Sequence, residues 1–214
     1  KMHPDFVDLC LAVDRDDARF VVAGLGDGFA AIAAEAEGAG ARDRFDLRGW
    51  VDDVGAELAG FDVFGYPLRP GNYGTAELVV QEAMAAGVPP VVLPYGGAAA
   101  VVEVGRTGIV AADEREYSRA LERLAADPDL RLRLGEAARE HARAAFSPAA
   151  VARRWVEIYG EMLELPKRSR SLGGSAPRVG AELFLASLGE SAGRDGFDAS
   201  RSGGSEQAAA ADDE

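Results

Sequence analysis

The sequence predicts an α/β fold in which a doubly wound parallel sheet is followed by C-terminal helices. As far as residue 111, short apolar runs alternate with amphipathic stretches of helical period. The run FVVAGL at residues 20–25 is apolar throughout, which is typical of a strand covered on both faces. Strands that alternate with helices form a parallel sheet with helices on both of its sides.

Glycine and capping residues set the expected element boundaries. Thr75 is the expected N-cap of a helix that ends at Gly87. Turns are marked by Gly26 and Gly28 and by the pair at residues 96–97. We expect strands over residues 20–25, 45–50, 61–67, 89–94 and 108–111, and helices over residues 4–13, 52–60 and 75–87, with an Ala-rich helix after the first strand.

The C-terminal part of the pattern is helical. Ser147 followed by Pro148 indicates a cap and the first residue of the last helix. His141 falls on an apolar stripe, so we expect it to pack and not to act as a ligand or a base. The three stripes of helical spacing are Tyr117, Ala120, Leu121 and Leu124; Leu130, Leu134, Ala138 and His141; and Val151, Trp155, Ile158, Tyr159 and Met162.

The periodic pattern predicts one domain over residues 1–165 and a tail over residues 166–214. The tail contains RSRSLGGS and SGGSEQAAAADDE, compositions typical of disorder. The first predicted element, residues 4–13, is a helix, whereas a sheet of this type begins with a strand. We therefore expect that a first strand precedes the sequence and that the chain is a fragment.

The charge balance excludes several classes of partner. The 214 residues carry 23 Lys and Arg against 36 Asp and Glu, a net charge of −13, which disfavours nucleic acid and anionic lipid. The single cysteine, Cys10, cannot form an internal disulfide and favours a reducing compartment. Apolar runs such as PPVVLP are too short to span a bilayer, and KMHPDF lacks the order of a signal peptide. We expect a soluble, cytoplasmic protein with no evident membrane association.

The loop before residue 75 is the expected ligand site, because ligands of open α/β sheets bind beyond the carboxyl ends of strands. Gly74 lets the backbone approach a ligand closely. The free amides of Thr75, Ala76 and Glu77 at the expected helix start can donate to phosphate oxygens. Arg69 supplies a charge-assisted contact. The sequence therefore predicts that a phosphate-bearing ligand binds here.

Two glutamates of the same predicted helix are candidates for the rest of the ligand. Glu82 is expected to share a face with Thr75 and to accept two hydroxyls of a ribose. Glu77 lies about 140° around the helix from Glu82 and is expected to contact a different part of the ligand. Each also fits a plain surface position, in which Glu77 complements the helix dipole. No Cys/His cluster has the spacing of a metal site, so no metal is expected.

The segment QEAMAAGVPPVV, followed by GG and later by GRTG, resembles the donor-binding C-terminal domain of retaining glycosyltransferases with the GT-B fold, the group 1 (family 4) class. The resemblance covers about residues 1–165. It implies a Rossmann-like sheet, a nucleoside-diphosphate-sugar as donor substrate, no metal, and an acceptor that the sequence does not identify. It also implies an N-terminal domain, missing here, so donor binding is expected but turnover by this half alone is not.

The resemblance assigns roles by position. Glu82 occupies the position of the ribose-binding glutamate, and Trp50 with Val51 forms the segment that meets the nucleobase. Lys1 corresponds to a lysine that neutralises the donor diphosphate. A second glutamate, expected eight positions before Glu82, is replaced by Gly74. Either Glu77 takes over the contact with the transferred sugar, or the sugar is held differently.

The expected function is transfer of a sugar from a nucleoside diphosphate to an acceptor hydroxyl with retention, with Lys1 and Glu77 as candidate catalytic residues. A non-catalytic nucleotide-sugar-binding module is the main alternative. Gly74 supports it, as does Ala100, which stands where the class carries an acidic residue after GG. A two-domain epimerase is a second alternative, for which this half supplies only His3 as an acid or base.

Overall fold

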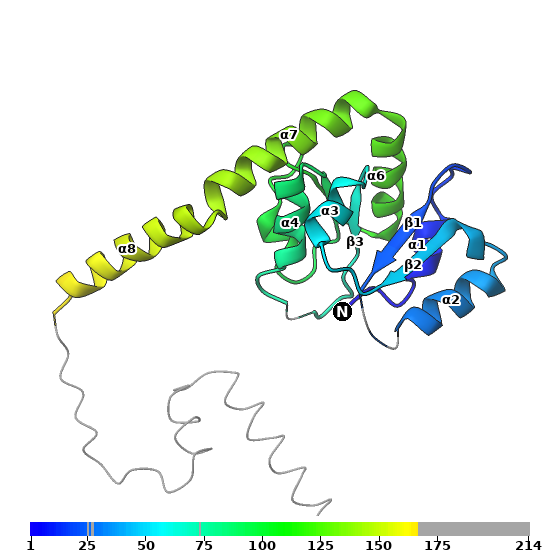
Figure 1. Cartoon of the computed structure of the whole chain (residues 1–214), viewed down its shortest axis with the longest axis horizontal. Helices are drawn as coiled ribbons and strands as arrows, with labels where there is room; N and C mark the ends of the chain where they lie inside the picture. Colours follow the sequence, from blue (N-terminus) through cyan, green and yellow to red (C-terminus); the bar gives the residue numbers. More distant parts are fainter. Residues whose placement is uncertain (25, 27, 73, 167–214) are drawn as a thin grey trace, which may run out of the picture. The chain divides into compact units, whose positions relative to one another are not determined.

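The computed structural model describes residues 1–24, 26, 28–72 and 74–166 (Figure 1). The chain divides into two compact units, Lys1–Met162 and Leu163–Glu214, and the elements that position the candidate site belong to the first. Apart from Pro166, the tail predicted over residues 166–214 lies outside the described residues.

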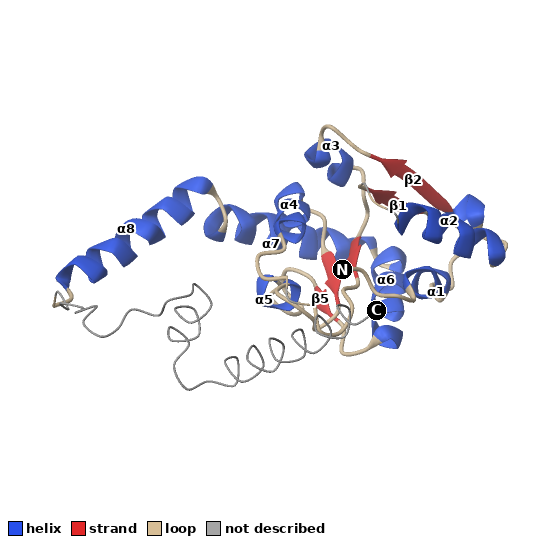
Figure 2. Ribbon diagram, turned by 90° about the horizontal axis from the view of Figure 1, so that it is seen from below, coloured by secondary structure: helices blue, strands red, loops and turns tan. Residues whose placement is uncertain are grey.

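Five strands among the described residues form two parallel sheets (Figure 2). One sheet pairs β1 with β2, and the other has the order β3-β4-β5. The single sheet predicted from the sequence is thus divided, because no described strand pairs with both β1 and β3. The predicted strands are confirmed with shorter bounds: β1 (Phe20–Ala23), β2 (Phe45–Gly49), β3 (Phe64–Tyr66), β4 (Pro90–Val92) and β5 (Ile109–Val110).

Helices alternate with the strands, as the sequence pattern predicts. The short helix α5 and a 3-10 helix over Arg42–Arg44 are additions to the predicted elements. The α-helices are α1 (Phe6–Leu11), α2 (Gly28–Gly38), α3 (Val54–Ala59), α4 (Leu78–Ala86), α5 (Ala98–Val101), α6 (Glu114–Ala126), α7 (Pro128–Ala145) and α8 (Pro148–Glu164).

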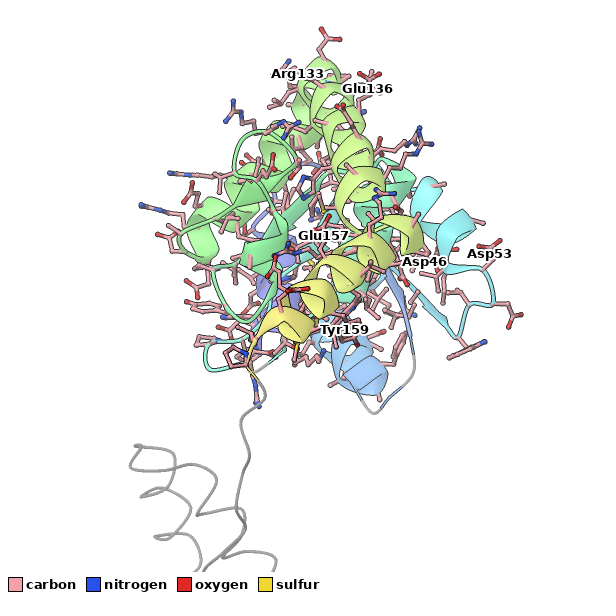
Figure 3. All side chains as sticks on the ribbon, turned by 90° about the vertical axis from the view of Figure 1, so that its left-hand side faces the viewer. Asp46, Asp53, Arg133, Glu136, Glu157 and Tyr159 are labelled. Carbon is pink, nitrogen blue, oxygen red and sulfur yellow. The ribbon has the colours of Figure 1, made fainter. Side chains whose placement is uncertain are left out.

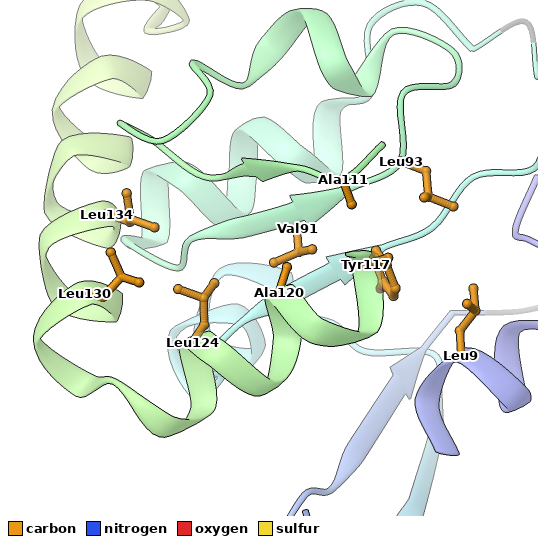
Figure 4. Close-up of a cluster of buried hydrophobic side chains, with 9 residues drawn as sticks. All are labelled: Leu9, Val91, Leu93, Ala111, Tyr117, Ala120, Leu124, Leu130 and Leu134. Carbon is orange, nitrogen blue, oxygen red and sulfur yellow. The ribbon is translucent and has the colours of Figure 1, made fainter. Parts of the chain in front are cut away.

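Both faces of β4 are covered, which explains its uniformly apolar sequence. Val91 and the following Leu93 belong to a core cluster that includes residues of α1, α6 and α7, whereas Val92 belongs to a second cluster with α4, α5 and α7. Alternate residues of one strand therefore pack against two layers of helices, the arrangement of a doubly wound fold. Figure 4 shows the first cluster: Leu9, Val91, Leu93, Ala111, Tyr117, Ala120, Leu124, Leu130 and Leu134.

The apolar stripes of the last three helices differ in burial. Leu124 of α6 and Leu134 of α7 lie in the core, which confirms the first two stripes as packed faces. No residue of α8 is buried within the described chain. Its Trp155 and Tyr159 stack on each other with ring centroids 5.4 Å apart, and Figure 3 shows Tyr159 extending from the helix. The third stripe is therefore amphipathic, as predicted, but exposed.

Helices α4 and α7 approach so closely that a glycine is required between them. Gly87 ends α4 in the left-handed region with φ 84°, as predicted for the C-terminal stop. A Cβ atom added to Gly135 of α7 would overlap the carbonyl oxygen of Gly87. Since that oxygen is part of the backbone, it cannot move aside as a flexible side chain does.

We predict that Gly135→Ala lowers the free energy of unfolding by roughly 1–3 kcal/mol, the usual cost of overpacking a core. Gly160→Ala in α8 is the matched control, because nothing lies within 4 Å of a Cβ atom at that helical position. The control should raise the free energy of unfolding by roughly 0.5–1 kcal/mol. Urea denaturation of both variants measures the difference, and equal stability of the two would contradict the close packing.

Candidate functional site

The candidate site lies beyond the carboxyl end of β3. The first residues of the chain run beside the loop that follows this strand: the His3 amide donates to the Pro67 carbonyl at 2.8 Å, and the Arg69 amide donates to the Lys1 carbonyl at 3.0 Å. These bonds bring Lys1 and Arg69 together although the sequence separates them widely. Both basic residues are exposed at the position where ligands of doubly wound sheets bind.

The start of α4 differs from the prediction. The helix begins at Leu78, and Glu77, not Thr75, is its N-terminal flanking residue, with no capping hydrogen bond from its side chain. The predicted N-cap at Thr75 is therefore wrong. The reason lies in the backbone of Glu77, which has φ 39° and ψ 59° and so occupies the left-handed region. The amides of Thr75, Ala76 and Glu77 belong to the preceding loop, and the first-turn amides of the helix begin with Leu78.

The strained backbone of Glu77 places its carboxylate inside the molecule. The residue is 5% exposed, and its Oε2 atom accepts a hydrogen bond from the Tyr66 hydroxyl at 2.9 Å. The Lys1 Nζ atom lies 3.7 Å from the same oxygen. A buried carboxylate is costly unless it is paired, and Lys1 and Tyr66 supply that pairing. The structure thus brings together the two candidate catalytic residues, Lys1 and Glu77.

Glycines of the loop make room for this carboxylate. A Cβ atom at Gly74 would overlap the Glu77 Oε1 atom. The Gly74 amide donates to Asn72 Oδ1 at 2.6 Å, and its carbonyl accepts from the Gly97 amide at 2.7 Å. A Cβ atom at Gly97 would overlap the Thr75 carbonyl oxygen. The GG turn after β4 therefore packs directly on the candidate site, which gives a physical reason for glycine at both places.

One oxygen of the site has no partner. The Oε1 atom of Glu77 is buried and accepts no hydrogen bond in the described structure. Leaving such an acceptor unpaired costs about 1–3 kcal/mol, more when it is charged. A ligand hydroxyl or a water molecule that donates to this atom would recover that free energy.

The other predicted contact residues lie in the same loop and in α4, most of them at exposed positions. Glu82 of α4 is exposed, and so are Thr75, Ala76 and Arg69, whereas Gly74 is half-buried. The prediction that Glu82 shares a helical face with Thr75 is wrong, because Thr75 lies outside the helix. The carboxylate of Glu82 is nevertheless open to a ligand.

Trp50 and Val51 follow the carboxyl end of β2, the strand paired with β1. The Trp50 indole is 69% exposed, and its Nε1 donates to Asp52 Oδ1 at 2.9 Å. Val51 is half-buried. An exposed aromatic ring at this edge offers a flat apolar surface, which fits the predicted contact with a base.

The histidines are both engaged inside the fold. The His3 side chain is 6% exposed, its Nδ1 accepts from the Asp5 amide at 3.3 Å, and its Nε2 lies 3.3 Å from Glu114 Oε1. With both ring nitrogens occupied, His3 does not support the epimerase alternative. His141 lies edge-on against Phe146, as expected of a packed residue.

Within the described residues, no group of three or more His, Cys, Asp or Glu side chains is placed to hold a metal ion. In the same residues, no helix is both long and apolar enough to cross a membrane.

Tyr66 and Asn72 are the site residues that sequence reasoning missed. Burial, followed by the hydrogen bond to Glu77, raises the pKa of the Tyr66 phenol, so it remains a donor at neutral pH. Tyr66 stands at the end of a predicted strand, and strand ends in this fold face the site. That position was the available signal, whereas nothing in the sequence distinguishes Asn72 from an ordinary loop residue.

The parallel strands, helices on both faces and a loop site at the strand ends define an α/β protein of the doubly wound class. The family model for glycosyl transferases group 1 matches residues 4–127, more than half of the chain. The chain therefore belongs to the group 1 glycosyltransferase family, as the resemblance of its motifs predicted.

Proteins with a similar sequence include D-inositol 3-phosphate glycosyltransferases. The protein from Streptomyces bingchenggensis is 38% identical over 100 residues, which cover 45% of this chain and 22% of the relative. That from Corynebacterium kroppenstedtii is 32% identical over 114 residues, 52% of this chain and 24% of the relative. The chain thus matches about a quarter of the length of these relatives.

Solved structures share the fold. Anabaena HepE, crystallised with UDP and glucose, superposes with a TM-score of 0.62 at 20% identity, over 72% of this chain and 43% of HepE. A glycosyltransferase from Rickettsia africae gives a TM-score of 0.65 at 18% identity, over 78% of this chain and 46% of that protein. The neighbours are GT-B glycosyltransferases, and the predicted fold class is confirmed.

We predict that Tyr66→Phe lowers the free energy of unfolding by roughly 1.5–3 kcal/mol, because a buried carboxylate loses its hydroxyl donor. In a Glu77→Gln background the same substitution should cost less, since the charge that strengthens the bond is gone. A double-mutant cycle measured by urea denaturation gives the coupling free energy. An equal cost in both backgrounds would show that the charge of Glu77 does not strengthen its bond with Tyr66.

Proposed function

We propose that residues 1–165 form the donor-binding half of a retaining glycosyltransferase that takes a nucleoside-diphosphate-sugar as donor. The observation that carries this proposal is the buried carboxylate of Glu77 at the start of α4. One of its oxygens accepts a hydrogen bond from Tyr66, and the other has no partner among the described residues. The exposed Lys1 lies 3.7 Å from this carboxylate, Arg69 is exposed in the loop after β3, and Glu82 is exposed on α4. The relatives support the class of reaction, and UDP in the HepE crystals supports the class of donor.

The donor diphosphate is proposed to bind between the basic residues and the helix start. Lys1 and Arg69 supply positive charge, and their main chains are hydrogen-bonded to each other. The first amides of α4, beginning at Leu78, donate to phosphate oxygens, and the helix dipole adds about 0.3–1 kcal/mol. Fixed charges of this kind stabilise the diphosphate as it leaves, which is an electrostatic form of catalysis.

The nucleoside and sugar portions are assigned to different residues. Glu82 is proposed to accept the ribose hydroxyls, and Trp50 and Val51 to contact the base. Glu77 is proposed to meet the transferred sugar through its unpaired Oε1, in place of the glutamate that the class carries at the position of Gly74. Because Gly74 has no side chain, the Glu77 carboxylate reaches the space that such a glutamate would occupy.

Retention of configuration is part of this proposal. No described side chain is placed as an obvious covalent nucleophile, and the leaving phosphate is proposed to help deprotonate the acceptor on the same face. Acceptor binding is assigned to a second domain of the kind that this class uses.

A non-catalytic nucleotide-sugar-binding module is the second candidate. The absence of an acidic side chain at Gly74 and at Ala100 favours it. The two candidates differ in turnover and not in donor binding. They are distinguished by joining the chain to a GT-B N-terminal domain and measuring hydrolysis of UDP-glucose or transfer of its sugar. Transfer supports the enzyme, and binding without transfer supports the module.

We predict that Glu82→Gln weakens binding of a nucleoside diphosphate by about 1.5–3 kcal/mol, the range for hydrogen bonds to a charged group. Isothermal calorimetry with UDP, GDP and ADP first identifies the base that binds, and the variant is then measured with that ligand. Glu140→Gln is the matched control, because Glu140 is an exposed glutamate of α7, outside the proposed site. Unchanged affinity in Glu82→Gln would remove this residue from the site.

A further inference from the structure

Helix α8 carries an apolar stripe that no part of the described chain buries. Val151, Trp155, Ile158 and Met162 are spaced by four, three and four residues, which is the spacing of a coiled-coil seam. Trp155 is 51% exposed and Met162 is 59% exposed, and no residue of α8 is buried among the described residues. Most of the stability of a helix in a protein comes from packing of its apolar face. We therefore expect α8 to have a partner.

The stripe is symmetric about its midpoint, which lies between residues 156 and 157. Val151 and Met162 are equally far from this point along the sequence, and so are Trp155 and Ile158. In a dimer with twofold symmetry, a contact from one residue to a second is repeated from the second to the first. Two antiparallel copies of α8 therefore place Val151 against Met162 of the second copy, and Trp155 against its Ile158.

The charges beside the stripe favour the same direction. Arg154 and Glu161 are seven residues apart, so they lie on the same flank of the stripe. Matching flanks meet when two such helices run antiparallel, which brings each Arg154 to the Glu161 of the other copy. In a parallel pair Arg154 would meet the opposite flank, where Tyr159 lies. Charges at these flanking positions set the partner and the orientation of paired helices.

The other side of α8 is polar and can remain in water. Arg153 and Glu157 are exposed there, and Figure 3 shows Glu157 and Tyr159 extending from different sides of the helix. The Arg154 Nη1 atom lies 3.2 Å from Glu157 Oε2, and both side chains are exposed. An exposed ion pair of this kind contributes little to stability, so Arg154 can turn to a carboxylate of a second copy at little cost.

We infer that α8 joins two copies of this chain as an antiparallel helix pair. The seam consists of Val151, Trp155, Ile158 and Met162, and reciprocal ion pairs form between Arg154 and Glu161. A second copy is the occupant that fits, because the apolar order and the flanking charges are both self-complementary in this direction. The inference rests on α8 alone and does not depend on the proposed function.

Sedimentation of the whole chain tests for the dimer. The measurement uses physiological salt, which screens the repulsion between two copies of net charge −13. A reversible monomer–dimer equilibrium is expected over about a hundredfold range of protein concentration. A monomer at every concentration overturns the inference, whatever else covers the stripe.

Trp155→Glu should abolish the dimer, because it places a charge in the apolar seam. Leu132→Glu is the matched control: Leu132 lies on α7 and is 64% exposed, so the same change falls outside the proposed interface. Neither residue is buried, so both variants should keep the thermal midpoint of the monomer. Loss of the dimer in both variants, or in neither, overturns the inference.

Charge reversal tests the proposed ion pairs. Arg154→Glu and Glu161→Arg should each weaken the dimer about tenfold, because each turns attraction into repulsion at both ends of the helix pair. The double variant should recover the affinity, since it exchanges the two signs. A double variant that dimerises no better than either single variant contradicts the antiparallel pairing.

Cysteine cross-linking tests the direction independently. Under mild oxidation the double variant Val151→Cys, Met162→Cys should form covalent dimers, and Val151→Cys alone should not, because the antiparallel pair keeps its two copies of residue 151 at opposite ends. Burial raises the pKa of the Cys10 thiol to about 12, which keeps this native cysteine unreactive. Equal cross-linking of the single and double variants indicates a parallel or non-specific pair and overturns the inference.

Discussion

The buried carboxylate of Glu77 is the constraint on which the loop between β3 and α4 depends. Its left-handed backbone turns the side chain inward, Tyr66 and Lys1 pair with one of its oxygens, and Gly74 leaves space for the other. The GG turn after β4 then contacts the same loop through Gly97. Backbone strain of this kind costs of order 1–3 kcal/mol and persists where the surroundings enforce it, often at functional sites. The start of α4 and the position of the Lys1 ammonium group both follow from this arrangement.

A consequence of this arrangement is that the candidate site draws on distant parts of the chain. Lys1 reaches it through hydrogen bonds to the loop after β3, and Trp50 lies at the end of β2. Lys1 and Trp50 thus both lie near the carboxyl ends of parallel strands, the edge at which ligands of doubly wound sheets bind. The family membership of the chain and the GT-B fold of its structural neighbours agree with a ligand site at that edge.

Much of the fold was predictable from sequence because its strands are buried on both faces. Runs such as the one that contains Val91 and Val92 are apolar for that reason, and Ser147 accepts the Ala150 amide at the predicted start of α8. The predicted start of α4 failed because Thr75 is a good N-cap by residue type, and local preference gave way to burial of Glu77. Its pairing with Tyr66 was not predictable, since it depends on a backbone conformation that glutamate rarely adopts.

The central claim is that a nucleoside diphosphate binds where the loop after β3 meets α4. An ¹⁵N–¹H NMR titration of the chain with the nucleoside diphosphate that binds most tightly tests it directly. The account predicts that the largest shift changes fall on the amides of residues 74–79 and on the Trp50 indole. Saturable changes confined to other elements, or no change at millimolar ligand, would contradict it.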